Sequence, residues 1–165
     1  MRRSAVVLVT LVSLLGSVVA GLTRKRRLES GDFSGREDVV RLAMSELGRS
    51  DPGRYWEDVL SPDETRPEHS WCGAFALWVL RTLGLTDWTY DRNGAWFYQL
   101  PGTKHPEPGD LAFMKGIRHL AIVAAVRDDS VDLVNGAGTG GKVTTSTVSR
   151  AAITEFRSIA PLLAA

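Results

Sequence analysis

A long apolar stretch starts at the only cysteine of the chain and sets the strongest limit on its fold. Cys72 is followed by Gly-Ala-Phe-Ala-Leu-Trp-Val-Leu, and Gly84 comes shortly afterwards. An apolar run without a charge predicts a buried helix. We expect Ser70 to be its N-cap and Gly84 its C-terminal stop, which places Cys72 in the first turn.

A cysteine in the first turn of a helix is suited to nucleophilic catalysis. The free backbone N–H groups and the positive end of the helix dipole favour a thiolate there, and the thiolate is the nucleophile in covalent catalysis. A lone cysteine is also often a small apolar residue that fills a core. The position of Cys72 alone therefore leaves both interpretations open.

Length and composition limit the class of protein. The 165 residues are enough for one domain with a hydrophobic core, and the net charge of +1 gives no field that would attract nucleic acid. One cysteine excludes an internal disulfide and any zinc site with two thiolates. We expect no cofactor, and a metal site built from Cys72 and His69 is kept as an alternative.

The N-terminus has the features of a targeting segment. Arg2 and Arg3 precede an apolar run over residues 5–22, which is typical of a signal peptide cleaved before Gly21 or of an uncleaved membrane anchor. The basic cluster at residues 24–27 opposes export under the positive-inside rule. We still predict export to the periplasm, cell envelope or extracellular space, with a cytoplasmic domain as the alternative topology.

The chain divides into three parts on this interpretation. Residues 1–22 are the signal peptide or anchor, with possible membrane contact, residues 23–33 are a basic linker, and residues 34–160 are the folded domain.

Helical patterns occupy the first half of this domain. Residues 34–37, Ser-Gly-Arg-Glu, fit a capping box. The helix that follows carries Val40, Met44 and Leu47 on one face, with Val39 and Ala43 beside it. Residues 49–70 contain three prolines and predict a long irregular connection. A short helix is expected over residues 94–100.

Strand patterns occupy the second half. The expected strands, separated by tight turns and by a glycine-rich loop at 136–142, are residues 111–114, 119–126, 131–135, 143–148 and 153–159. Helices followed by short strands predict an α+β fold in which the helices pack on one face of a small antiparallel sheet.

A thiolate nucleophile needs a base nearby. His69 and His105 lie in expected loops, whereas His119 opens a predicted strand directly after a turn. A side chain at the start of a strand can project toward the N-terminus of a helix packed on that sheet. His119 is therefore the candidate base for Cys72.

Aromatic residues are concentrated around the predicted helices. The group at residues 88–98 is expected mainly to pack against the core, and substrate contact by Trp71 or Trp96 is the alternative interpretation.

Three motifs in order resemble the CHAP family of cysteine, histidine-dependent amidohydrolases and peptidases, which cut bacterial peptidoglycan. They are Trp-Cys-Gly-Ala-Phe at 71–75, Pro-Gly-Asp-Leu-Ala-Phe at 108–113 and His-Leu-Ala-Ile-Val at 119–123. The resemblance covers residues 35–158. It implies a papain-like fold and a domain at 34–160 that acts on peptidoglycan or a similar peptide.

The resemblance also implies roles for individual residues. Cys72 would be the nucleophile and His119 the general base, and Asn135 is the chemical candidate for the third, orienting residue. Aligning the family pattern on Gly140-Gly141 instead would put Ala137 or Gly138 at that place. An alternative to an enzyme is a non-catalytic envelope protein with a degenerate CHAP-like fold that binds peptidoglycan or a partner.

Overall fold

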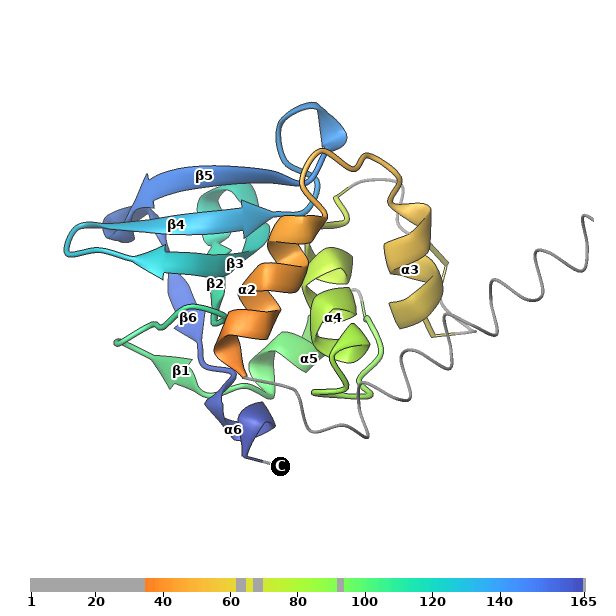
Figure 1. The fold of residues 1–165 in the computed structure, drawn as a ribbon, viewed down its shortest axis with the longest axis horizontal. Helices are drawn as coiled ribbons and strands as arrows, with labels where there is room; N and C mark the ends of the chain where they lie inside the picture. Colours follow the sequence, from red (N-terminus) through yellow and green to blue (C-terminus); the bar gives the residue numbers. More distant parts are fainter. Residues whose placement is uncertain (1–34, 62–64, 67–69, 92–93, 165) are drawn as a thin grey trace, which may run out of the picture. The chain divides into compact units, whose positions relative to one another are not determined.

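The computed structural model of the chain describes residues 35–61, 65–66, 70–91 and 94–164. Most of its helices precede the strands along the chain (Figure 1). The helices are α2 (Arg36–Ser45), α3 (Gly53–Val59), α4 (Cys72–Thr82), α5 (Ala95–Tyr98) and α6 (Ala160–Leu163). The strands are β1 (Gly102–Thr103), β2 (Leu111–Met114), β3 (His119–Val126), β4 (Ser130–Asn135), β5 (Thr144–Ser149) and β6 (Glu155–Arg157).

The strands form one sheet in the order β1-β6-β2-β3-β4-β5, and every neighbouring pair is antiparallel. Strands β2 to β5 are consecutive and form a meander, and the chain then returns so that β6 pairs with the free edge of β2. The predicted α+β class with an antiparallel sheet is confirmed.

The core contains two apolar clusters on opposite faces of the sheet. Along β3, Leu120 and Ile122 belong to the cluster that also holds residues from α2, α3, α4 and α5. Ala121 and Val123 belong to a smaller cluster built mainly from strand residues. This alternation is what a strand with two covered faces requires, and it confirms that the helices pack on one face.

Helix α4 is the central helix, with α2, α3 and β3 packed against it (Figure 1). Every residue over 72–80 is buried, as expected for a helix that is apolar all round. Its C-terminus is a Schellman motif, because Gly84 (φ 74°) donates to Arg81 O and Leu85 donates to Leu80 O. The predicted stop at Gly84 is confirmed.

The predicted N-caps of the two long helices are wrong. Trp71, not Ser70, is the N-cap of α4, since Ser70 has a left-handed backbone (φ 59°) that is unlike an N-cap. Gly35, not Ser34, is the N-cap of α2, and it has no side-chain cap. Ser34 itself lies outside the described residues.

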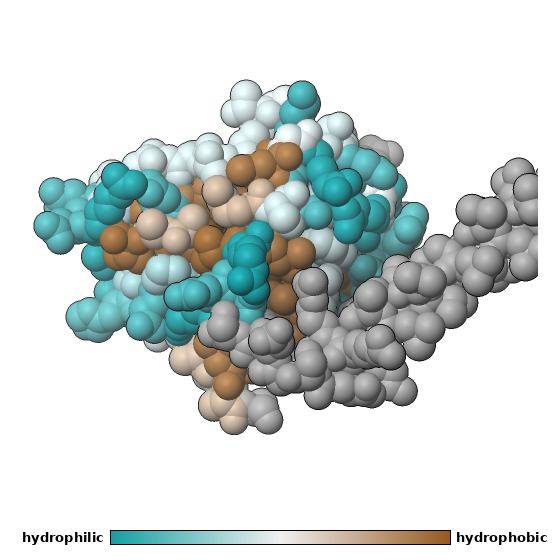
Figure 2. All heavy atoms as spheres, in the orientation of Figure 1, coloured by the Kyte–Doolittle hydropathy of each residue, from teal (hydrophilic) through white to brown (hydrophobic). Residues whose placement is uncertain are grey.

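The buried face of α2 also differs from the expected one. Val39 and Ala43 are fully buried, whereas Met44 is 39% and Leu47 42% exposed. Hydrophobic residues therefore reach the surface over α2, as Figure 2 shows in the orientation of Figure 1. The predicted irregular connection at 49–70 contains helix α3, and β1 and α6 were not predicted.

The Pro-Gly-Asp motif has a structural role in the described domain. The carboxylate of Asp110 is fully buried and accepts hydrogen bonds from Arg36 Nη1 (2.5 Å), Ile159 N (3.0 Å) and Glu107 N (2.9 Å). These bonds join the first turn of α2 to the segment after β6. A buried carboxylate with this many donors is fully paired.

A close contact between Gly136 and α4 fixes the end of β4 against that helix. A Cβ at Gly136 would lie 2.5 Å from Phe75 Cβ and 2.9 Å from Phe75 Cγ. Since Phe75 is buried, we expect Gly136→Ala to lower the free energy of unfolding by about 1–3 kcal/mol through overpacking. Chemical denaturation measures this loss.

Gly102→Ala is the matched control, because nothing lies within 4 Å of a Cβ at Gly102. Equal denaturation midpoints for the two variants would contradict the close approach of β4 to α4.

Candidate active site

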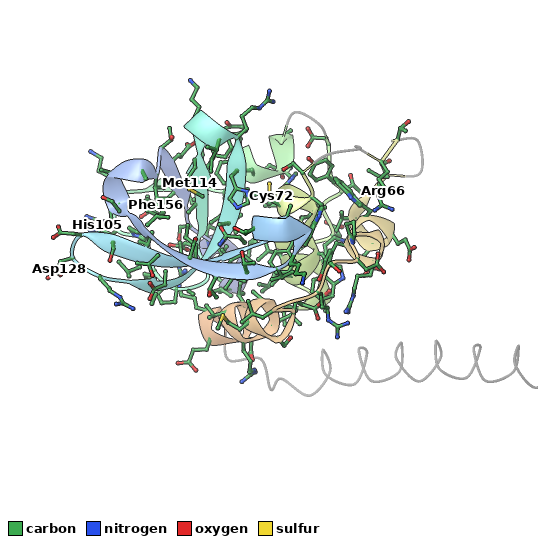
Figure 3. All side chains as sticks on the ribbon, turned by 90° about the horizontal axis from the view of Figure 1, so that it is seen from above. Arg66, Cys72, His105, Met114, Asp128 and Phe156 are labelled. Atoms are coloured by element: carbon green, nitrogen blue, oxygen red, sulfur yellow. The ribbon has the colours of Figure 1, made fainter. Side chains whose placement is uncertain are left out.

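Cys72 is the first residue of α4 and is 6% exposed. The first backbone hydrogen bond at this end of the helix runs from Phe75 N to Trp71 O (2.9 Å). The N–H of Cys72 therefore has no acceptor within the helix, and it lies at the positive end of the helix dipole. Figure 3 shows the labelled Cys72 beside the teal ribbon of the β2–β3 region.

Three hydrogen-bonding groups of the described residues contact the sulfur. Ser70 Oγ lies 3.1 Å from Cys72 Sγ, and the side chain of His119 and the backbone N–H of Leu120 also bond to the sulfur. Burial raises the pKa of the Cys72 thiol, but these bonds and the charge of His119 outweigh it and lower the pKa to about 7. A large part of the thiol is therefore ionised at neutral pH.

His119 is the first residue of β3, directly after the 3-10 turn Lys115–Ile117. Arg118 closes this turn in a left-handed conformation (φ 48°), so the chain reverses immediately before the histidine. The reversal pairs His119 with Met114 at the start of the strand. The imidazole reaches Cys72 on one side and Asn135 on the other.

Asn135 is the last residue of β4 and is buried. It pairs with Ala121, two residues after His119 on the same strand, so the two polar side chains lie on one face of the sheet as diagonal neighbours. His119 Nε2 lies 3.0 Å from Asn135 Oδ1.

The orientation of the Asn135 amide determines which imidazole nitrogen is basic. Asn135 Nδ2 donates to Thr144 O (3.3 Å) and lies 3.0 Å from Ser146 Oγ. A carbonyl only accepts, so Nδ2 faces β5 and Oδ1 faces His119. Nε2 must then carry a proton to donate to Oδ1, and Nδ1 is left to take the proton of the thiol.

The charge state of the imidazole follows from the same contacts. Burial lowers the pKa of His119, but the hydrogen bond and charge of Cys72 and the hydrogen bond to Asn135 outweigh it, so the pKa is raised above its ordinary value. A lowered thiol pKa beside a raised imidazole pKa favours a thiolate–imidazolium pair.

The ionisation of Cys72 can be measured directly. We expect the rate of alkylation by iodoacetamide to be half-maximal near pH 7, because the pKa of Cys72 is lowered to about 7 and only the thiolate reacts. The same chain unfolded in denaturant is the control, and its midpoint should lie at about 8.5. A folded midpoint that equals the unfolded one would contradict the described surroundings of the sulfur.

The two tryptophans named as alternative substrate contacts lie in the core. Trp71 is 8% exposed and stacks on Tyr55 with ring centroids 5.2 Å apart. Trp96 is 2% exposed and packs edge-on against Phe97. Burial of both indoles argues against a substrate contact and favours the core-packing interpretation.

His105 does not join the site. His105 is exposed and lies well away from Cys72 in Figure 3. His69, half of the alternative metal site, lies outside the described residues. Within the ranges given above, no group of three or more His, Cys, Asp or Glu side chains is arranged to hold a metal ion.

The arrangement of thiol, imidazole and amide is matched by a family comparison. Residues 64–137 match the family model described as CHAP domain, and this range includes Cys72, His119 and Asn135. The match supports a CHAP-family domain over these residues. No curated protein and no solved structure matches the chain.

Two contacts of this site were not predicted from the sequence. Ser70 was expected to cap a helix, yet its hydroxyl faces the sulfur of Cys72. Ser146, on β5, orients Asn135 but lies in an alternating Thr/Ser strand where no residue stands out. A polar residue two positions before the cysteine was the only available signal for the first contact.

Proposed function

We propose that the protein is a cysteine hydrolase that cleaves amide bonds in the peptide part of peptidoglycan. The observation that supports this most is the chain of contacts from Cys72 through His119 to Asn135 at the start of a buried helix. A CHAP domain belongs to a family of amidase- and peptidase-type hydrolases associated with peptidoglycan.

The first half of the proposed reaction forms a thioester. The lone pair of the Cys72 thiolate attacks the carbonyl carbon, and the π electrons of the carbonyl move to its oxygen. When this tetrahedral intermediate collapses, the C–N bond breaks and the leaving nitrogen takes the proton from His119 Nδ1. The free amine departs and the acyl group stays on the sulfur.

The second half returns the enzyme to its starting state. His119 Nδ1, now neutral, takes a proton from a water molecule as its oxygen attacks the thioester carbonyl. Collapse of the second intermediate breaks the C–S bond and releases a carboxylic acid. The thiolate and the imidazolium are restored, and Asn135 holds the imidazole in the same tautomer throughout.

Access to peptidoglycan would come from export, which rests on the sequence alone. Residues 5–22 lie outside the described part of the chain, and no helix within that part is both long and apolar enough to cross a bilayer. We propose that the apolar segment delivers the CHAP domain to the cell envelope as a signal peptide or an anchor.

Digestion of purified peptidoglycan with mass analysis of the released fragments tests this function. We expect new amine and carboxylate ends at one class of amide bond, which would separate amidase from endopeptidase action. Intact peptidoglycan after incubation with protein whose Cys72 alkylates at neutral pH would overturn the proposed substrate. It would favour the non-catalytic or binding alternative.

A further inference from the structure

We propose that the hydroxyl of Ser70 is a donor to the oxyanion that forms when Cys72 attacks a carbonyl. The backbone N–H of Cys72 supplies one donor at the start of α4, and Ser70 supplies the second. This inference rests on the reactivity of Cys72, and it concerns acyl transfer to that sulfur whatever the natural substrate is.

Proximity is the first argument. Ser70 Oγ lies 3.1 Å from Cys72 Sγ, and Ser70 is exposed whereas Cys72 is buried. The carbonyl oxygen of a substrate lies two bonds from the sulfur once the C–S bond has formed. A hydroxyl beside the sulfur can rotate about its side chain to reach that oxygen, at about the 2.7–3.1 Å required of an oxyanion donor.

The backbone of Ser70 is the second argument. Its φ of 59° lies in the left-handed region, which side chains other than Gly, Asn and Asp seldom adopt. Such a conformation is strained and persists only where the surroundings impose it. Here it turns the side chain of Ser70 away from capping α4 and toward the reacting atom.

The movement of charge is the third argument. In the resting state the negative charge is on the sulfur, where Ser70, His119 and Leu120 N–H stabilise it. During attack the charge moves to the carbonyl oxygen. The N–H of Leu120 is fixed within β3, whereas the hydroxyl of Ser70 is free to follow the charge, so Ser70 stabilises the transition state as well as the thiolate.

Two small reagents separate this role from a structural one. Acylation of Cys72 by p-nitrophenyl acetate passes through an oxyanion, whereas alkylation by iodoacetamide is a direct displacement at carbon that forms none. Both reagents are used on the full chain at a pH above the ionisation of the thiol. Ser70→Gly removes the hydroxyl and accepts a positive φ, Ser70→Ala removes it and keeps the strain, and Ser70→Thr retains a hydroxyl.

We expect Ser70→Gly and Ser70→Ala to slow acylation about 10-fold or more, and alkylation by less than about threefold. Ser70→Thr should acylate faster than either. In Ser70→Gly and Ser70→Ala the pH midpoint of alkylation should rise, because a hydrogen bond to the thiolate is lost. An equal loss in both reactions, or unchanged acylation in Ser70→Gly, would overturn the proposal. Since neither reagent is peptidoglycan, failure of the peptidoglycan digestion is a separate result.

Discussion

Replacing Cys72 with alanine is expected to reduce peptidoglycan hydrolysis by roughly 10⁴-fold or more, to the uncatalysed background. The sulfur forms the covalent bond in both half-reactions, and no other cysteine is present in the sequence. The stability of the domain should change by about 1 kcal/mol or less, because alanine fills most of the same buried space. Fragment release and thermal unfolding of the same preparation measure the two effects.

Cys72→Ser tests whether the reaction requires a thiolate or only a nucleophilic atom at this position. A serine hydroxyl stays protonated where the thiol ionises at about pH 7, so this variant should also be inactive although its oxygen occupies a similar place. Measurable hydrolysis by Cys72→Ala would remove the nucleophile assignment. Inactivity together with a large drop in melting temperature would instead indicate a packing role for the cysteine.

The sequence predicted the elements that are continuous and apolar. Strands β2, β3 and β4 were expected within one residue of their bounds, since β-branched runs between tight turns leave few alternatives. Helix α3 was not expected, because Pro52 and Gly53 are typical of a loop. They lie at its N-cap and first helical residue, where both are tolerated.

The pairing of β6 with β2 could not be predicted from the sequence for a different reason. The residues of β6 are a plausible strand in the sequence, but the choice of the β2 edge over the β5 edge depends on long-range contacts. One of these is the buried carboxylate of Asp110, which accepts a hydrogen bond from Ile159 N just after β6. A local sequence pattern does not indicate a contact between residues that are 49 positions apart.

The juxtaposition of Cys72 and His119 was predictable because each opens a regular element, and a helix start and a strand start can meet across a helix–sheet interface. Asn135 was open to doubt, since an Asn-Gly pair is also typical of a turn. The structure brings it to His119 through the strand register, which places it opposite Ala121. The contact of Ser70 with the sulfur depends on the left-handed φ of Ser70, which a serine in the sequence does not indicate.

Replacing His119 with alanine is expected to reduce hydrolysis by about 10²–10⁴-fold, and also to change the titration of Cys72. The hydrogen bond and the charge of His119 both lower the pKa of the thiol. Without them the burial of the sulfur, which raises the pKa of the thiol, is opposed by the hydrogen bonds from Ser70 and Leu120. The midpoint of iodoacetamide alkylation should therefore rise from about 7 toward or above the value of about 8.5 for a free cysteine.

His105→Ala is the matched control, because this histidine is exposed and distant from the site. It should leave both the rate of hydrolysis and the midpoint of alkylation unchanged.

The behaviour of His119→Ala at high pH separates two roles for His119. At high pH the thiolate of His119→Ala forms again and alkylation recovers, but hydrolysis stays low because no group protonates the leaving amine. Recovery of hydrolysis at high pH would mean that His119 only ionises the thiol and is not the acid of the reaction.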